Sequence, residues 1–135
     1  MKKAILMLLV SVMLIASLNI STLGAMPETV TPLWENTAFT TETMDFDGTA
    51  GGAAMRVTGK AGTTRVEGRG VVYKLVGTDW VYVTEASNAT NGRSCLVEIL
   101  FEGEIGYEYK AEYEFVVYKD GVGEVITSTL TAVCD

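Results

Sequence analysis

Residues 107–118 read YEYKAEYEFVVY, and this stretch decides the fold class. Two kinds of side chain alternate along it, which is typical of a β-strand with one dry face and one wet face. The first kind is apolar or aromatic and the second is charged: Tyr107, Tyr109, Ala111, Tyr113, Phe115 and Val117 against Glu108, Lys110, Glu112 and Glu114. We expect the first set to face the core of an antiparallel sheet, because the charges mark the opposite face as solvated. A row of tyrosines that stacks on sugars is the alternative.

The rest of the chain from Thr37 onward repeats this kind of pattern. Short runs rich in β-branched and aromatic residues alternate with clusters of Gly, Asp and Asn, and no helical periodicity is present. A polar loop is expected at 86–93, and Gly68 and Gly70 predict a bulge or bend within one strand. The predicted fold is all-β, a seven-stranded antiparallel β-sandwich over residues 37–135. Its strands are expected at Thr37–Phe46, Ala53–Thr58, Thr63–Val76, Trp80–Glu85, Cys95–Phe101, Tyr107–Tyr118 and Val125–Val133.

The N-terminus has the parts of a secretory signal peptide. Lys2 and Lys3 form a positive start, residues 4–18 are an uncharged apolar run, and the small residues Gly24 and Ala25 mark the expected cleavage position. The apolar run is too short to span a bilayer comfortably, which argues against the alternative of an uncleaved anchor. We expect a helical signal peptide at residues 1–25 and an extended arm at residues 26–36, which holds both prolines. The expected protein is secreted and extracellular, without a stable membrane anchor.

Charge and composition exclude several classes of function. The chain has 10 Lys plus Arg and 17 Asp plus Glu, so removal of Lys2 and Lys3 with the signal peptide leaves a net charge of −9. This acidic balance argues against nucleic acid as a partner and against anionic membrane surfaces. The chain has no histidine, which removes the Ser-His-Asp and Cys-His nucleophilic arrangements and the histidine-based zinc sites.

Several short motifs spread over the chain together carry a resemblance. They are Trp34-x-Asn36-Thr37, Gly62-Thr63-Thr64, Tyr73-Lys74-Leu75 with Trp80 after the turn, Gly106-Tyr107-Glu108-Tyr109, and Val117-Tyr118-x-x-Gly121-x-x-Glu124. In these the chain resembles a group of small secreted all-β proteins of Gram-positive bacteria whose function is uncharacterised. The resemblance implies an immunoglobulin-like sandwich and export, and it implies no activity and no catalytic residue. The segment from Gly106 to Tyr109 is also similar to the corner tyrosine of immunoglobulin-like folds, although no Cys follows two residues later.

A turn at Gly77-Thr78-Asp79 joins the third and fourth predicted strands and sets the register of their hairpin. With all three residues in the loop, Val76 pairs with Trp80, Leu75 with Val81, Lys74 with Tyr82 and Tyr73 with Val83. The face expected in the core then holds Val71, Tyr73, Leu75, Val81 and Val83, and the outer face holds Val72, Lys74, Val76, Trp80 and Tyr82. The predicted binding surface is an exposed patch of Trp80, Tyr82 and Lys74 with Tyr118 nearby. An error of one residue in the register would instead bury Trp80.

Two cysteines are expected to remain free thiols. Cys95 opens the fifth predicted strand and Cys134 closes the seventh, and two reversals between them make these strands run in the same direction. The thiols are then roughly 20 Å apart or more at about 3.3 Å per residue, whereas a disulfide needs Cα atoms closer than about 7 Å. Both residues fall on the inward-pointing alternation, where a free cysteine acts as a small hydrophobe.

No catalytic residue, metal site or cofactor is predicted. Asp45 and Asp47 precede a Gly-rich turn, but the full calcium-loop spacing is missing and a solvated strand end is the favoured interpretation. Glutamates from Glu98 to Glu114 offer many carboxylate pairs, yet no pattern places one in the apolar pocket that a general acid needs. The favoured function is a non-enzymatic extracellular module that binds a protein or carbohydrate ligand. The alternatives are a secreted hydrolase with a carboxylate pair and a structural subunit that assembles through strand edges or the arm.

Overall fold

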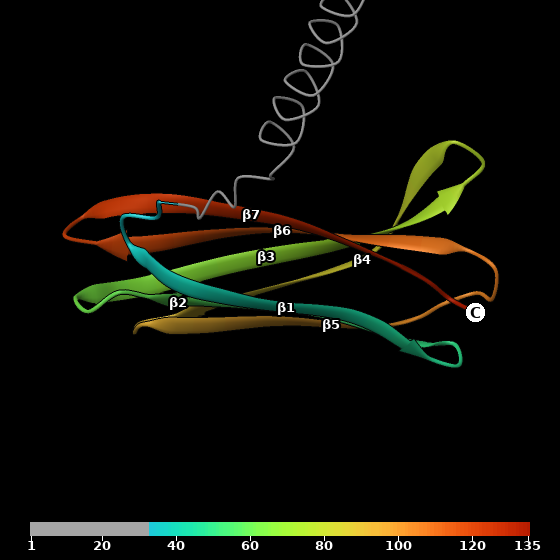
Figure 1. The fold of residues 1–135 in the computed structure, drawn as a ribbon, viewed down its shortest axis with the longest axis horizontal. Coiled ribbons are helices and arrows are strands. Elements are labelled where there is room, and N and C mark those ends of the chain that lie inside the picture. The colour runs from blue at the N-terminus through green and yellow to red at the C-terminus, as the bar shows by residue number, and fades with distance from the viewer. Residues whose placement is uncertain (1–32) are drawn as a thin grey trace, which may run out of the picture. The chain divides into compact units, whose positions relative to one another are not determined.

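A computed structural model describes residues 33–135, which form two sheets of antiparallel strands and contain no helix. One sheet has the order β1-β2-β5 and the other has the order β4-β3-β6-β7 (Figure 1). The strands are β1 (Thr37–Asp47), β2 (Ala50–Gly59), β3 (Thr63–Val76), β4 (Asp79–Thr90), β5 (Ser94–Glu102), β6 (Glu108–Lys119) and β7 (Val122–Val133). The prediction of an all-β, seven-stranded antiparallel fold is confirmed. The expected signal peptide at residues 1–25, and the arm as far as residue 32, lie outside the described residues.

Several strands are longer than the sequence predicts: β7 begins at Val122 rather than Val125, and the largest differences affect β4 and β2. β4 continues to Thr90 and pairs with β3 along its length, so the prediction of a polar loop at 86–93 is wrong over its first half. Polar side chains can occupy this segment because one side of the strand is exposed there. β2 begins at Ala50 rather than Ala53, and Gly51 within it lies against the rings of Phe101 and Phe46, where an added Cβ would come within 2.7 Å of Phe101.

The core lies between the two sheets, and the alternation in β6 predicts its position correctly. Tyr109, Ala111, Tyr113, Phe115 and Val117 are all buried, so the alternative of a tyrosine platform for sugars on this face is wrong. Tyr107 precedes the strand and is exposed. The opposing residues come from β2 and β5: Ala53, Met55, Val57, Cys95, Val97 and Ile99.

The two glycines within β3 serve close packing. A Cβ at Gly68 would lie 2.3 Å from the ring of Phe115, and one at Gly70 would lie 2.4 Å from the ring of Tyr113. The register of β3 is continuous from Val66 to Val72 on both sides. The expectation that these glycines mark a bulge or bend is therefore wrong: they make room for two aromatic rings of β6.

Both sides of the sandwich are joined by side chains. Asn88 on β4 donates a hydrogen bond from Nδ2 to the carbonyl oxygen of Leu96 on β5, at 2.9 Å. On the opposite side, the hydroxyl of Ser128 on β7 donates to the carboxylate of Glu42 on β1. Within residues 33–135, no helix is long and apolar enough to cross a membrane.

Candidate functional site

The tip of the β3–β4 hairpin is a two-residue turn, Gly77-Thr78. Gly77 has a φ of 66° and Thr78 has no positive φ, which corresponds to the type II′ turn with Gly at its first central position. Val76 pairs with Asp79, Leu75 with Trp80, Lys74 with Val81 and Tyr73 with Tyr82. The predicted three-residue loop is therefore wrong, and each pair near the tip is displaced by one residue.

A bulge further along the hairpin reverses this displacement. The register shifts between Val72 and Tyr73, so that Val72 pairs with Thr84 and Val83 is the extra residue on β4. Val72 is buried in the core, whereas Val71, Tyr73 and Leu75 are only partly buried. The prediction that Val71, Tyr73 and Leu75 form the core face of this strand is wrong. The opposite face of β3, which carries the small residues Gly68, Gly70 and Val72, faces the core instead.

Trp80 and Tyr82 lie on the outer face of the four-stranded sheet, exposed by 36 % and 56 %. Tyr73 pairs with Tyr82 on one side and with Lys110 of β6 on the other. The ammonium group of Lys110 lies 4.6 Å from the ring centroid of Trp80 and 5.1 Å from that of Tyr73. We call Tyr73, Trp80 and Tyr82 the aromatic patch. Lys110 holds two of its rings in place by cation–π contact and is itself bound to Glu112 at 2.6 Å.

Lys74 and Tyr118 do not join the aromatic patch. Lys74 points to the other side of the hairpin, where its Nζ bonds Glu104 at 2.8 Å and lies 4.6 Å from the ring centroid of Tyr107. The hydrogen bond with Glu104 raises the pKa of Lys74 above its ordinary value. Tyr118 pairs with Arg65 and Gly123 near the far end of β6, eight residues from Lys110, which is roughly 26 Å along a strand. The structure brings together only Trp80 and Tyr82 of the four predicted residues.

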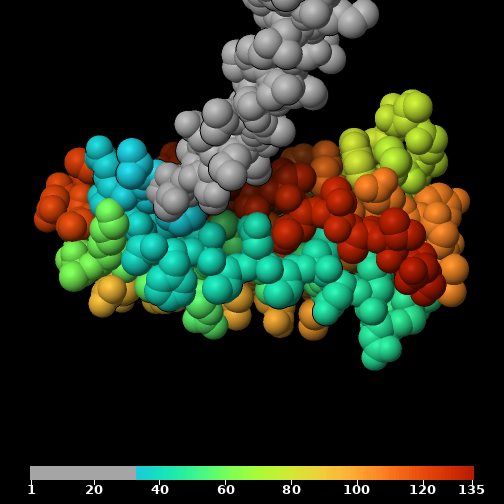
Figure 2. Space-filling model, viewed as in Figure 1, coloured from blue at the N-terminus to red at the C-terminus, as the bar shows by residue number. Residues whose placement is uncertain are grey.

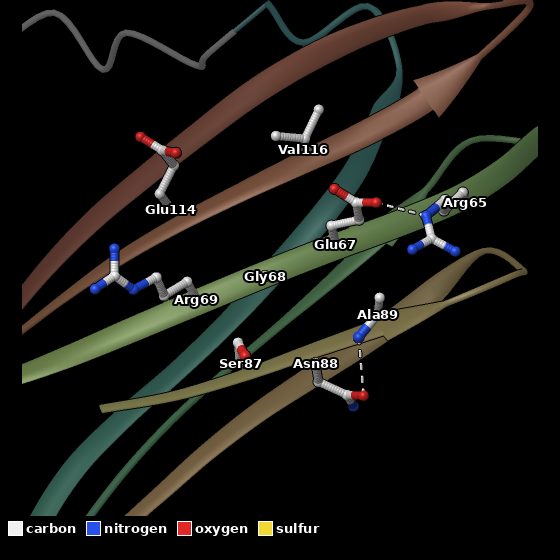
Figure 3. Close-up of a pocket in the computed structure, with 9 residues that line it drawn as sticks. All are labelled: Arg65, Glu67, Gly68, Arg69, Ser87, Asn88, Ala89, Glu114 and Val116. Carbon is white, nitrogen blue, oxygen red and sulfur yellow. Dashed lines mark hydrogen bonds and ion pairs between the residues drawn. The ribbon is translucent and has the colours of Figure 1, made fainter. Parts of the chain in front are cut away.

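A shallow depression of about 550 Å³ lies on the same outer face, further from the hairpin tip (Figure 3). It is bordered by charged side chains, which include Arg65, Arg69, Glu67 and Glu114. Arg65 bonds Glu67 at 2.6 Å, and Arg69 bonds Glu85 through two nitrogens. The bond to Glu85 raises the pKa of Arg69. These pairs neutralise much of the charge in the depression.

Glu124 binds the first residues of the domain through hydrogen bonds, a role that the sequence does not predict. Its carboxylate accepts hydrogen bonds from the backbone N–H groups of Glu35, Asn36 and Thr37, each at 2.8 Å, and from the Thr37 hydroxyl at 2.9 Å. Asn36 is buried and donates through Nδ2 to the carbonyls of Val117 and Val122. Residues 34–36, which the sequence assigns to the arm, are thus bound to the sandwich.

The pKa of Glu124 reflects these bonds. Partial burial by itself raises the pKa of this carboxyl, but the hydrogen bonds from the Thr37 hydroxyl and from the three backbone N–H groups outweigh it and lower the pKa below its ordinary value. Both partners belong to short motifs noted in the sequence, Trp34-x-Asn36-Thr37 and Val117-Tyr118-x-x-Gly121-x-x-Glu124, but no local pattern indicates that these two segments are in contact. Their contact across the fold gives them a structural role.

Cys95 and Cys134 are buried and unlinked. Cys95 pairs with the end of β2 at Val57, whereas the thiol of Cys134 lies 3.4 Å from the carbonyl oxygen of Gly48, beside the turn that precedes β2. The thiols therefore lie at opposite ends of the sandwich. Burial raises the pKa of Cys95, which makes its reactive thiolate form rarer.

The acidic residues do not converge on a metal site in the described part of the chain. Among residues 33–135, no group of three or more His, Cys, Asp or Glu side chains is placed to hold a metal ion. Asp45 and Asp47 lie on one exposed side of β1, near its end.

Comparison with known proteins adds no assignment. No protein-family model matches the chain, and no curated protein sequence matches it. The candidate site therefore depends on geometry alone.

Proposed function

We propose that this protein is a non-enzymatic extracellular module that binds a protein or carbohydrate ligand through the aromatic patch. The observation that carries the proposal is the exposure of Trp80 and Tyr82 on one sheet face, beside Tyr73 and Lys110. Exposed aromatic rings give large contact area at low entropic cost, and they are enriched among residues that dominate binding energy. The signal peptide pattern at residues 1–25 supports an extracellular location.

We also propose that the sandwich is immunoglobulin-like. The first, second and fifth strands share one sheet and the third, sixth and seventh share the other, as in that fold. The fourth strand pairs with the third, whereas in the constant-type arrangement it joins the first sheet. Support also comes from Tyr109 at the start of β6, whose hydroxyl accepts a 2.8 Å hydrogen bond from the backbone N–H of Glu104, five residues upstream. This contact is similar to a tyrosine corner.

The binding proposal is tested with the secreted protein on arrays of bacterial and host glycans and of extracellular proteins. Trp80→Ala and Tyr82→Ala are each expected to weaken the strongest interaction at least about tenfold. Leu100→Ala is the matched control, because Leu100 is 74 % exposed on the other sheet, and its affinity is expected to equal that of the wild type. An interaction that survives both aromatic substitutions would contradict the proposal.

A secreted hydrolase is the second candidate, since two carboxylates, Glu67 and Glu114, border the depression on the outer face. An assay with a panel of glycosides and esters tests it. Turnover that is abolished by Glu114→Gln and retained in Trp80→Ala would favour the hydrolase over the binding module.

A further inference from the structure

The outer edge of β4 near the hairpin tip is an unpaired strand edge. β4 is the terminal strand of its sheet, so no described strand pairs with its outer side. Figure 1 shows the tip of this hairpin standing away from the body of the sandwich, and Figure 2 shows the same projection in yellow-green. Unpaired strand edges are templates for pairing with another chain.

This edge is also more apolar than the others. Trp80, Val81 and Tyr82 are each exposed, and within residues 33–135 no other three consecutive large apolar residues are exposed. Proteins usually protect an edge with charges, a proline or a covering segment. β1 and β7 are joined to each other by Glu42 and Ser128, and β5 is joined to β4 by Asn88, whereas Trp80–Val83 carries no charge and no proline.

The register determines which main-chain groups face this edge. The pair Val76 and Asp79 closes a two-residue turn and therefore occupies a hydrogen-bonded position of the ladder. Hydrogen-bonded and non-hydrogen-bonded pairs alternate along the ladder from that pair. Val81, opposite Lys74, is therefore hydrogen-bonded to β3. Trp80 and Tyr82 occupy the non-hydrogen-bonded positions, so their N–H and C=O groups point away from β3, toward the open edge.

We propose that a second copy of this chain pairs with this edge, antiparallel and about a two-fold axis at Val81. Trp80 then lies opposite Tyr82 of the second copy, and Tyr82 lies opposite Trp80 of the second copy. Both residues are the ones whose main-chain groups point outward, so the symmetric register satisfies those groups on both chains. The pairing joins the two four-stranded sheets and brings two aromatic patches side by side on one face.

The side chains fit the same arrangement. Trp80 and Tyr82 of opposite chains become cross-strand aromatic pairs, which stabilise antiparallel sheets. Asp79, the charged residue of β4 next to the contact, lies opposite Val83 of the second copy and not opposite a like charge. The contact is small, so the dimer is expected to be weak and concentration-dependent. Added salt is expected to strengthen it, because each chain has a net charge of −9 after removal of Lys2 and Lys3 with the signal peptide, and salt screens that repulsion.

Sedimentation velocity of the purified protein from about 10 μM to about 1 mM tests the pairing in the range of weak affinities. A dimer fraction that rises with concentration is expected in the wild type, and it is expected to disappear in Tyr82→Lys, which places a charge on the edge. Leu100→Lys is the control and is expected to dimerise like the wild type. A wild type that stays monomeric at all concentrations would overturn the proposal. An extended strand of another protein would then be the occupant to test at this edge. A dimer that persists in Tyr82→Lys would also overturn it.

A disulfide tests the two-fold axis itself. Val81 of the two copies would form a non-hydrogen-bonded pair with Cα atoms about 4.5 Å apart, within the range for a disulfide. Val81→Cys is expected to form a covalent dimer on mild oxidation. Val76→Cys is the control, because Val76 and Val81 have similar exposure, 43 % and 47 %, but β3 of the two copies would be separated by two strands of β4. Equal cross-linking of both variants, or none with Val81→Cys, would contradict this register. These results are independent of ligand binding, which the arrays measure separately.

Discussion

The middle of β6 and the tip of the β3–β4 hairpin both alternate aromatic residues with other side chains, but only the first belongs to the core. In β6 the residues that alternate with the buried ones from Tyr109 to Phe115 are Lys110, Glu112 and Glu114, so one face is wet and the other must be dry. In the hairpin, Trp80 and Tyr82 alternate with Val81 and Val83, and both faces are apolar. Alternation identifies the core when one face is charged. Where both faces are apolar, only one of them can face the core, and the other remains exposed and can contact a partner.

The largest expected effect is in β6. Phe115 is fully buried and its ring fills the space left by Gly68. Phe115→Ala is expected to lower the free energy of unfolding by about 3 to 5 kcal/mol, because it removes buried apolar surface and leaves a cavity. Urea unfolding measures this change. A loss under 1 kcal/mol would show that β6 does not contribute the core.

The same contrast shows how far the sequence can lead. The number of strands, their approximate bounds and the buried face of β6 could all be predicted, because charges and turn residues mark them. The hairpin register could not, because Gly77-Thr78-Asp79 permits a two-residue or a three-residue loop, and the flanking residues are apolar on both faces apart from Lys74, so they do not distinguish the two loops. The bulge at Val83 then shifts the register again, and no residue type in the sequence predicts this bulge.

The positions of some residues of the candidate site also could not be predicted from a sequence pattern. The prediction that Lys74 and Trp80 share a face is wrong because the observed register differs by one residue, and such a shift moves every side chain of one strand to the opposite face. Tyr118 is on the outer face but at the far end of its strand, a distance that depends on the pairing of β6 with β3. The contact between Glu124 and residues 35–37 joins segments 87 to 89 residues apart, which no local pattern reports.

Glu124→Gln is expected to have an intermediate effect, a loss of about 2 kcal/mol, because it removes the charge from bonds that a carboxylate makes more strongly. The effect is also expected to depend on pH. The folded-state pKa of Glu124 lies below that of the unfolded chain, so its contribution is present above about pH 4.3 and is lost as the pH falls through the folded-state value. Unfolding experiments at pH 7 and pH 3 should show the difference between the two proteins shrinking at pH 3. An equal difference at both values would contradict the role of the charge.

Trp80→Ala is expected to cost about 1 kcal/mol or less, although tryptophan is the largest side chain. The residue is exposed on the outer face and is not part of the core, and the contacts it loses include the cation–π contact with Lys110. The measurement is the unfolding curve at low protein concentration, beside that of Phe115→Ala. A loss as large as that of Phe115→Ala would place Trp80 in the core and remove the contrast between the two regions.

The smallest effect is expected at Tyr113, in the core near Phe115. Its hydroxyl is buried without a hydrogen-bond partner among the described residues, and burial, with the charge of Glu98, raises its pKa to about 12. Tyr113→Phe is expected to leave the stability unchanged or raise it by about 1 kcal/mol, because it removes an unpaired polar group. Above about pH 10 the advantage should grow, since the unfolded chain ionises this tyrosine before the folded chain does. A loss of 2 kcal/mol would mean that the hydroxyl has a partner.

Residue-resolved amide hydrogen exchange of Trp80, Val81 and Tyr82 tests the hairpin edge most directly. At low protein concentration Val81 is expected to exchange slowly, because it occupies a hydrogen-bonded position opposite Lys74, while Trp80 and Tyr82 exchange quickly from the outer edge. At high concentration Trp80 and Tyr82 are expected to become protected as the second copy pairs with them. Slow exchange of Trp80 and Tyr82 with fast exchange of Val81 at low concentration would contradict the register, and exchange that does not change with concentration would contradict the pairing.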